Sequence, residues 1–145
     1  MIYNANIISS IDKASRFLLN GEIIVYPTDT LYGLGVDATN TKAIQKLNGL
    51  KKREQPYSII VDSFSMLKKY AILNSHIEDK IKSLLPGPFT VILKQKNNNL
   101  SKLVSLELET IGIRIPNNKF ILKVAKKMKL SLKDLHNIFF YLIIY

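Results

Sequence analysis

The chain of 145 residues contains no cysteine, only two histidines and only three arginines. Without cysteine it forms neither disulfide bonds nor thiolate metal sites, which agrees with a reducing compartment, and we expect a cytoplasmic protein. The histidines, His76 and His136, have no third candidate ligand near them in the sequence. We therefore expect no protein-bound metal site.

Long apolar runs and low-complexity tracts are also missing. No apolar stretch approaches the about 20 residues that a membrane-spanning helix needs, and the first six residues lack the pattern of a signal peptide. Since 47% of the residues are hydrophobic and 22% are charged, the composition is that of a globular protein. The length predicts one domain, residues 1–145, with no membrane partner.

The formal net charge is +10, which favours polyanionic partners such as RNA or nucleotide phosphates. Lysine, isoleucine and asparagine are abundant throughout, so a compositional bias toward these residues explains the charge equally well. Arginine is scarce, and its planar guanidinium binds carboxylates and phosphates in a way that lysine cannot reproduce. Arg53 and Arg114 are therefore more informative than the net charge.

The segment from Tyr26 to Gly35 has the composition of a ligand-binding loop. Residues 22–26 are mostly apolar and β-branched, which predicts a buried strand that ends at Pro27. Short hydroxyl and carboxyl side chains follow, and two glycines then allow close approach of the backbone. An ordinary strand-to-turn connection with its own caps fits these residues as well. We assign the organisation of this loop to Pro27, Thr28, Asp29, Tyr32 and Gly33.

Helices and strands alternate along the rest of the chain. Apolar spacing predicts helices over 10–20, with a cap at Ser9 or Ser10, and over 41–50, 64–73, 76–85 and from 117 onward. Strands are predicted over 22–26, 35–37, 57–61, 89–94 and 110–116. In the last strand Thr110, Gly112 and Arg114 share one face, and an arginine there is either a ligand-binding or a solvent-facing residue.

Four segments resemble, in order, those of the YrdC-like family, whose members include threonylcarbamoyl-AMP synthases. They are PTDTLYGLGVDATN from Pro27, KKREQP at 51–56, LPGPFTVIL at 85–93 and TIGIRIP at 110–116. Four ordered matches are much more specific than one short motif. The resemblance implies an α/β fold, a single twisted mixed sheet with flanking helices, incomplete at the C-terminus.

The resemblance also implies a reaction. Family members make threonylcarbamoyl-AMP from L-threonine, bicarbonate and ATP with Mg²⁺, releasing pyrophosphate, and the product modifies tRNA. By position, Thr30 and Arg114 correspond to threonine-binding residues, and Lys51, Arg53 and Thr110 to ATP-binding residues. This chemistry depends on alignment and charge rather than on a strong general base, so we expect no catalytic residue in the strict sense. The resemblance implies tRNA and other tRNA-modification proteins as partners.

Residues 130–145 depart from the family pattern. Relatives continue with a Ser-Ala-Asn-type loop that completes the nucleotide site, whereas this chain ends in eight apolar residues. We expect either a shortened reading frame or an apolar end that replaces a missing strand. The alternative functions are a non-catalytic RNA-binding module, an inactive truncated remnant and a carbamoyl-transfer relative.

Overall fold

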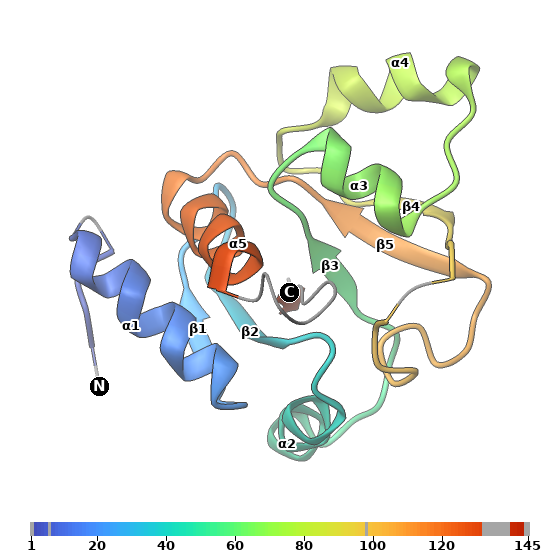
Figure 1. Cartoon of the computed structure of the whole chain (residues 1–145). Helices are drawn as coiled ribbons and strands as arrows, with labels where there is room; N and C mark the ends of the chain where they lie inside the picture. The colour runs from blue at the N-terminus through green and yellow to red at the C-terminus, as the bar shows by residue number, and fades with distance from the viewer. Residues whose placement is uncertain (1, 6, 98, 132–139, 144–145) are drawn as a thin grey trace.

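The computed structural model describes residues 2–5, 7–97, 99–131 and 140–143 (Figure 1). Within them the helices are α1 (Ile8–Leu19), α2 (Thr41–Lys51), α3 (Phe64–Tyr70), α4 (Ser75–Leu84) and α5 (Lys119–Ser131). The strands are β1 (Ile24–Tyr26), β2 (Gly33–Asp37), β3 (Ser58–Ile60), β4 (Val91–Lys94), β5 (Thr110–Arg114) and β6 (Phe140–Ile143).

The strands form one mixed sheet in the order β1-β2-β6-β3-β5-β4. Only β3 and β5 pair in parallel, and the other neighbours are antiparallel. The chain reaches β5 from β3 by way of α3, α4 and the edge strand β4, which lies on the far side of β5. This arrangement confirms the predicted mixed α/β sheet with flanking helices.

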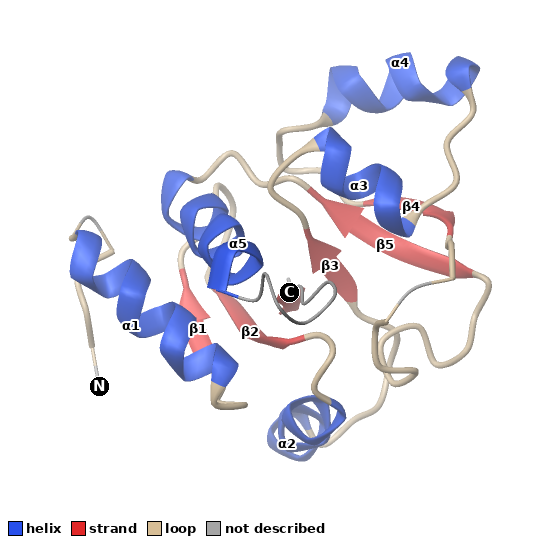
Figure 2. Cartoon of the chain, in the orientation of Figure 1, coloured by secondary structure: helices blue, strands red, loops and turns tan. Residues whose placement is uncertain are grey.

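The two faces of the sheet pack against different helices. Neighbouring residues of β3 show this, because they belong to different hydrophobic cores. Ile59 belongs to the larger core, which contains buried side chains of α2, α3 and α4. Ile60 belongs to the smaller core, which contains buried side chains of α1 and α5. Consecutive strand residues point to opposite faces, so β3 contributes to both cores. Figure 2 shows α1 and α5 beside β1 and β2, and α3 and α4 at the β4–β5 end.

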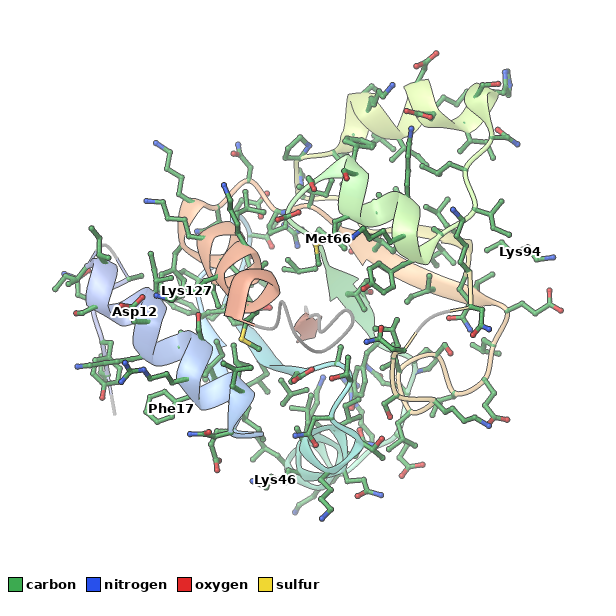
Figure 3. The ribbon with its side chains drawn as sticks, viewed as in Figure 1. Asp12, Phe17, Lys46, Met66, Lys94 and Lys127 are labelled. Atoms are coloured by element: carbon green, nitrogen blue, oxygen red, sulfur yellow. The ribbon has the colours of Figure 1, made fainter. Side chains whose placement is uncertain are left out.

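Helices α1 and α5, which are far apart in the sequence, lie side by side (Figure 1). Asp12 of α1 and Lys127 of α5 form an ion pair across them, and their side chains meet between the two helices (Figure 3). Both side chains are about 40% exposed, so the pair adds little stability, and the apolar contacts beneath it hold the helices together.

The predicted elements are present, with several corrections at their ends. The cap expected at Ser9 or Ser10 is wrong: α1 begins at Ile8, and Ser10 instead donates a hydrogen bond to the carbonyl oxygen of Asn4 at 2.6 Å. Leu50, the last residue of the helix predicted over 41–50, is 61% exposed. Helix α2 continues through Gly49 to Lys51, and Lys52 takes the left-handed conformation that ends it. The side chains of Asn40 and Ser63 cap α2 and α3 by accepting hydrogen bonds from the backbone N–H groups of Ala43 and Met66.

Gly33 should not tolerate a side chain. A Cβ there would lie 2.4 Å from the hydroxyl oxygen and 2.6 Å from Cζ of Tyr26, whose side chain is fully buried. Gly33→Ala is therefore expected to lower the free energy of unfolding by about 1–3 kcal/mol, measured by urea denaturation. Gly49→Ala is the matched control. A Cβ added at Gly49 would have no atom within 4 Å, and alanine stabilises a helix by about 0.5–1 kcal/mol relative to glycine. Equal effects of the two changes would contradict this explanation.

Part of the final stretch can be described. Residues 130 and 131 end α5, and the backbone of β6 pairs with both β2 and β3, so this apolar end supplies a strand inside the sheet. Residues 132–139, which include His136, and 144–145 lie outside the described residues. Within the described ranges, no helix has the length and apolar character needed to cross a membrane.

Candidate functional site

Arg114 and Thr30, separated by 84 positions in the sequence, are in direct contact. Both terminal nitrogens of the guanidinium lie 3.3 Å from Thr30 Oγ1, and Nη2 also donates to Asp29 Oδ1 at 2.5 Å. The third nitrogen, Nε, donates to the carbonyl oxygen of Gly87 at 3.1 Å. Three of the four family-like segments therefore meet at one side chain.

Arg114 is only 1% exposed, although the alternation in its strand leaves open a solvent-facing residue. It ends β5 on the face that carries Ile60 and Tyr26, and α1 and α5 cover that end of the face. A buried guanidinium requires a counter-charge and filled donors, and Asp29, at 14% exposure, supplies the charge. The solvent-facing alternative is thus wrong.

Thr28 holds the shape of the loop between β1 and β2. Its hydroxyl oxygen accepts hydrogen bonds from the backbone N–H groups of Thr30 at 3.0 Å and Leu31 at 3.1 Å. The same oxygen lies 3.0 Å from Thr30 Oγ1. These local bonds fix the backbone, and Arg114 fixes the exposed Thr30 side chain from the sheet side.

Two small residues, Ser58 of β3 and Gly112 of β5, are paired on the same sheet face. The row through them continues to Leu142 of β6 and Gly35 of β2 on one side and to Ile92 of β4 on the other. A Cβ at Gly112 would lie 2.6 Å from Ser58 Oγ, so glycine makes room for the serine side chain. Thr110 lies four residues from Arg114, about 13 Å along the strand. That length accommodates an amino acid beside part of a nucleotide.

Lys51 and Arg53 lie at the end of α2, before β3. Lys51 is the last residue of α2. The basic segment KKREQP at 51–56 therefore begins inside a helix and does not lie wholly in a surface loop. Its amino group lies 5.7 Å from the centre of the Tyr57 ring. Burial, and secondarily the positive charge of Arg53, lower the pKa of Lys51. The hydrogen bonds of the Thr30 and Arg114 side chains within the described residues involve neither of these cations.

The remaining predicted residues are spread along the loop and the strands. Pro27 follows the last residue of β1, and Gly33 opens β2 beneath the Tyr26 ring. Tyr32 is 72% exposed. Thr110 is exposed at the start of β5, paired with Lys94. The structure thus brings together Thr28, Asp29, Thr30 and Arg114, and leaves Thr110, Lys51 and Arg53 as separate groups.

Two contributors were not predicted from the sequence. Gly87 contributes a backbone carbonyl, which no side-chain pattern reveals. Tyr26 is fully buried, and its hydroxyl has no hydrogen-bond partner among the described residues. Burial raises the pKa of this phenol and the nearby Arg114 charge opposes that shift, so the hydroxyl keeps its proton. The position of Tyr26 at the end of an apolar strand, directly before the loop, was a usable signal for it in the sequence.

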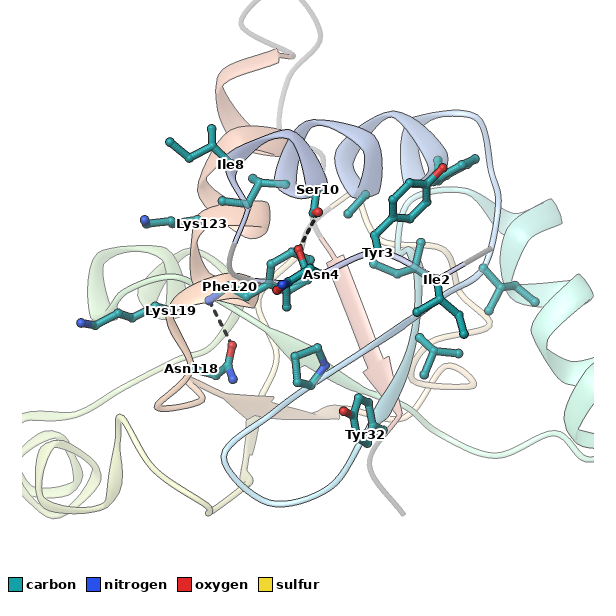
Figure 4. Close-up of a pocket in the computed structure, with 18 of the residues that line it drawn as sticks. Ile2, Tyr3, Asn4, Ile8, Ser10, Tyr32, Asn118, Lys119, Phe120 and Lys123 are labelled. Atoms are coloured by element: carbon teal, nitrogen blue, oxygen red, sulfur yellow. Dashed lines mark hydrogen bonds between the residues drawn. The ribbon is translucent and has the colours of Figure 1, made fainter.

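The hollow drawn in Figure 4 lies elsewhere, between the N-terminal segment, α1, β1 and the start of α5. Its volume is about 1320 Å³, and Tyr3, Phe120, Lys119 and Lys123 are among its described lining residues. Only Pro27 and Tyr32 connect it to the loop. The candidate site therefore rests on the Arg114 contacts, with Ser58 and Gly112 on the same sheet face, rather than on this hollow.

Metal ligands are sparse in the described ranges, where no three His, Asp or Glu side chains gather to hold an ion. Asp29, the carboxylate nearest Thr30 in the sequence, is bonded to Arg114. Magnesium is often bound chiefly through substrate phosphates, so this donor set suits a Mg²⁺ that arrives with ATP.

Comparisons with known proteins identify the family. Residues 16–133 match the Sua5/YciO/YrdC family, described as telomere recombination. A protein of Methanocaldococcus jannaschii is 40% identical over 110 residues, which are 74% of this chain and 52% of that protein. The threonylcarbamoyl-AMP synthase of Bacillus subtilis is 33% identical over 128 residues, 84% of this chain and 36% of the relative. The chain thus spans about a third to a half of these relatives.

Solved structures agree on the fold. Pyrococcus abyssi Sua5 complexed with L-threonine superposes with a TM-score of 0.80 at 23% identity, over 99% of this chain and 39% of that one. Escherichia coli YciO gives a TM-score of 0.76 at 24% identity, over 83% of this chain and 60% of that one. Sequence match and fold together show that the chain belongs to the Sua5/YciO/YrdC family.

Proposed function

We propose that this protein is a transferase that forms threonylcarbamoyl-AMP from L-threonine, bicarbonate and ATP for tRNA modification. The observation that carries the proposal is the contact of Thr30 with Arg114, which lies on the same sheet face as Ser58 and Gly112. Relatives named threonylcarbamoyl-AMP synthase, and a relative's structure complexed with L-threonine, support the choice of substrate.

The proposed reaction requires alignment of two charged partners. The neutral amine of threonine and bicarbonate give a carbamate and water, and a carbamate oxygen then attacks the α-phosphorus of ATP while pyrophosphate leaves. Neither step needs a strong base on the protein, and positioning alone can supply about 7–11 kcal/mol of the barrier. Thr30 marks the amino-acid end of the site, and Thr110, Lys51 and Arg53 are assigned to the nucleotide end.

The cations would offset the triphosphate charge. Lys51 and Arg53 precede β3, whose first residue, Ser58, pairs with Gly112, two residues after the exposed Thr110. Mg²⁺ enters with ATP and neutralises further phosphate charge. Positive groups placed before the reaction stabilise the charge that develops on the leaving pyrophosphate.

The test is a pyrophosphate-release assay on the full chain with L-threonine, bicarbonate, Mg²⁺ and ATP. We expect release that stops when either threonine or bicarbonate is omitted, and mass spectrometry should find threonylcarbamoyl-AMP. Thr110→Val should raise the KM for ATP severalfold with little change in the KM for threonine, because this side chain is assigned to the nucleotide alone. Release that is independent of threonine would overturn the proposal.

A non-catalytic RNA-binding role is the second candidate, favoured by the exposed lysines of α5, Lys119, Lys123 and Lys126. It predicts tRNA binding that weakens steeply with salt and is unaffected by ATP or threonine. Filter binding at low and high salt measures this directly. Absence of tRNA binding at low salt would remove this candidate.

A further inference from the structure

The outer edge of β1 is open. Within the described ranges, β1 pairs only with β2, and no backbone hydrogen bond joins its outer side to another segment. The other edge strand, β4, is partly covered: the N–H of Ile72 donates to the Lys94 carbonyl, and the N–H of Lys96 donates to the Tyr70 carbonyl. An open edge presents backbone N–H and C=O groups that can pair with another chain.

The hollow shown in Figure 4 runs along this edge. Its lining includes Ile23, which packs against the larger core, and Ile24, which packs against the smaller core. These neighbours point to opposite faces of the sheet, so a hollow that touches both lies at the edge. Its volume of about 1320 Å³ exceeds the about 300–1,000 Å³ that is usual for small-molecule pockets. The size and position suit an extended segment of chain better than a compact small molecule.

Exposed apolar side chains gather around the same hollow. They are Ile2, Tyr3, Ile8, Phe17, Val25 and Tyr32. Val25 lies in β1 itself and is 67% exposed. Exposed apolar side chains that gather in one place, with polar residues around them, mark interaction surfaces. The open strand edge and the apolar surface therefore coincide.

Positive charge lies at one end of the hollow. Figure 4 shows Lys119 and Lys123 on the side away from Ile2 and Tyr3. Both lysines are exposed, and no ion pair reaches them in the part of the chain that the structure describes. Arg114 contacts the loop that follows β1, and α5 begins shortly after Arg114, so these lysines lie toward the C-terminal end of β1. Acidic side chains are complementary to this end.

We propose that the hollow binds an extended, acidic peptide segment of another protein, which pairs with β1 as a further strand of the sheet. Antiparallel pairing, the more stable kind, places the acidic start of the peptide beside Lys119 and Lys123. Its apolar side chains then pack on the exposed ones around the hollow. A second copy of this chain is the poorer occupant, because two chains that each carry a net charge of +10 repel each other. The inference goes beyond the proposed function, since such binding requires neither ATP nor threonine.

The probe is a fluorescein-labelled peptide, Asp-Glu-Asp-Val-Thr-Val-Thr-Val, whose binding to the full chain is followed by fluorescence anisotropy. We expect saturable binding. Two further peptides carry N-methyl groups on one or the other set of alternate residues, and only one set can face β1. One methylated peptide should therefore bind at least tenfold more weakly, and the other within about threefold of the parent peptide. No saturation at about 1 mM chain, or equal binding of the two methylated peptides, would overturn the inference.

Val25→Asp tests the strand edge. We expect it to weaken binding of the acidic peptide at least tenfold, because the peptide must lie against this side chain. Ile72→Asp is the matched control, since Ile72 is 49% exposed, lies beside the opposite edge strand and undergoes the same change in charge. It should change binding by less than about twofold, and circular dichroism of both variants should match the parent chain. Equal losses in the two variants would contradict binding at β1.

Lys123→Glu tests the charged end. It should weaken binding of the acidic peptide at least fivefold, and it should strengthen binding of a peptide with lysines in place of the three acidic residues. Lys126→Glu, an exposed position on the same helix outside the lining of the hollow, should change neither by more than about twofold. Equal effects of the two variants would show attraction by net charge alone and would overturn the inference. Sedimentation of a dimer that Val25→Asp dissociates would also overturn it, because the occupant would then be a second copy.

Discussion

Asp29→Ala is expected to lower the free energy of unfolding by about 3–5 kcal/mol, because it leaves the Arg114 guanidinium buried without a counter-charge. The side chains of Arg114 and Asp29 are 1% and 14% exposed, and Nη2 lies 2.5 Å from Oδ1. For a chain of this size the loss corresponds to a decrease in Tm of roughly 10–16 °C. Thermal denaturation followed by circular dichroism measures it.

An exposed ion pair provides the control for this prediction. Lys102 and Glu107 are 2.9 Å apart with side chains 84% and 68% exposed, so Lys102→Ala should change the free energy of unfolding by less than about 1 kcal/mol. Combining Asp29→Ala with Arg114→Met removes both charges and should recover part of the lost stability. Equal losses in Asp29→Ala and Lys102→Ala would show that the buried pair has no special role.

Hydrophobic periodicity predicted most helices and strands because each element buries one face. The alternation over 110–116 is an example: Ile111, Ile113 and Ile115 all lie in the larger core. The ends of elements were less predictable, since they depend on single hydrogen bonds. Ser10 has a good capping side chain, but the Asn4 carbonyl takes its hydroxyl and α1 begins two residues earlier.

The candidate site was predictable in its residue types and less so in its contacts. The alternation of apolar and polar residues over 110–116 places Arg114 on a polar strand face. It cannot show that α1 and α5 bury the end of the face where Arg114 lies. The closeness of Thr30 and Arg114 was expected from the family resemblance, and the geometry agrees. That Asp29 and the Gly87 carbonyl take up the guanidinium donors depends on how three distant segments fold together.

These contacts also change how the loop is understood. A ligand loop and a self-capped turn were alternatives at the level of sequence, but the structure combines them. Thr28 closes the turn with local hydrogen bonds, and that closure presents Thr30 to solvent with Arg114 behind it. The residues that stabilise the turn thereby orient the exposed hydroxyl. We therefore expect stability and threonine binding to change together in this loop.

Arg53→Gln is expected to lower kcat/KM for ATP by about 10²–10³-fold if the proposed function holds, since it removes a positive charge assigned to the triphosphate.

Burial and the Arg53 charge lower the pKa of Lys51, so Lys51 loses its proton at a lower pH than an ordinary lysine. Removing Arg53 raises that pKa, and the alkaline limb of the pH–rate profile should move to higher pH. Lys52→Gln, an exposed neighbour with the same charge change, is the control and should leave the limb in place. NMR titration of the Lys51 amino group measures the same shift without turnover, and identical titrations in both variants would contradict the prediction.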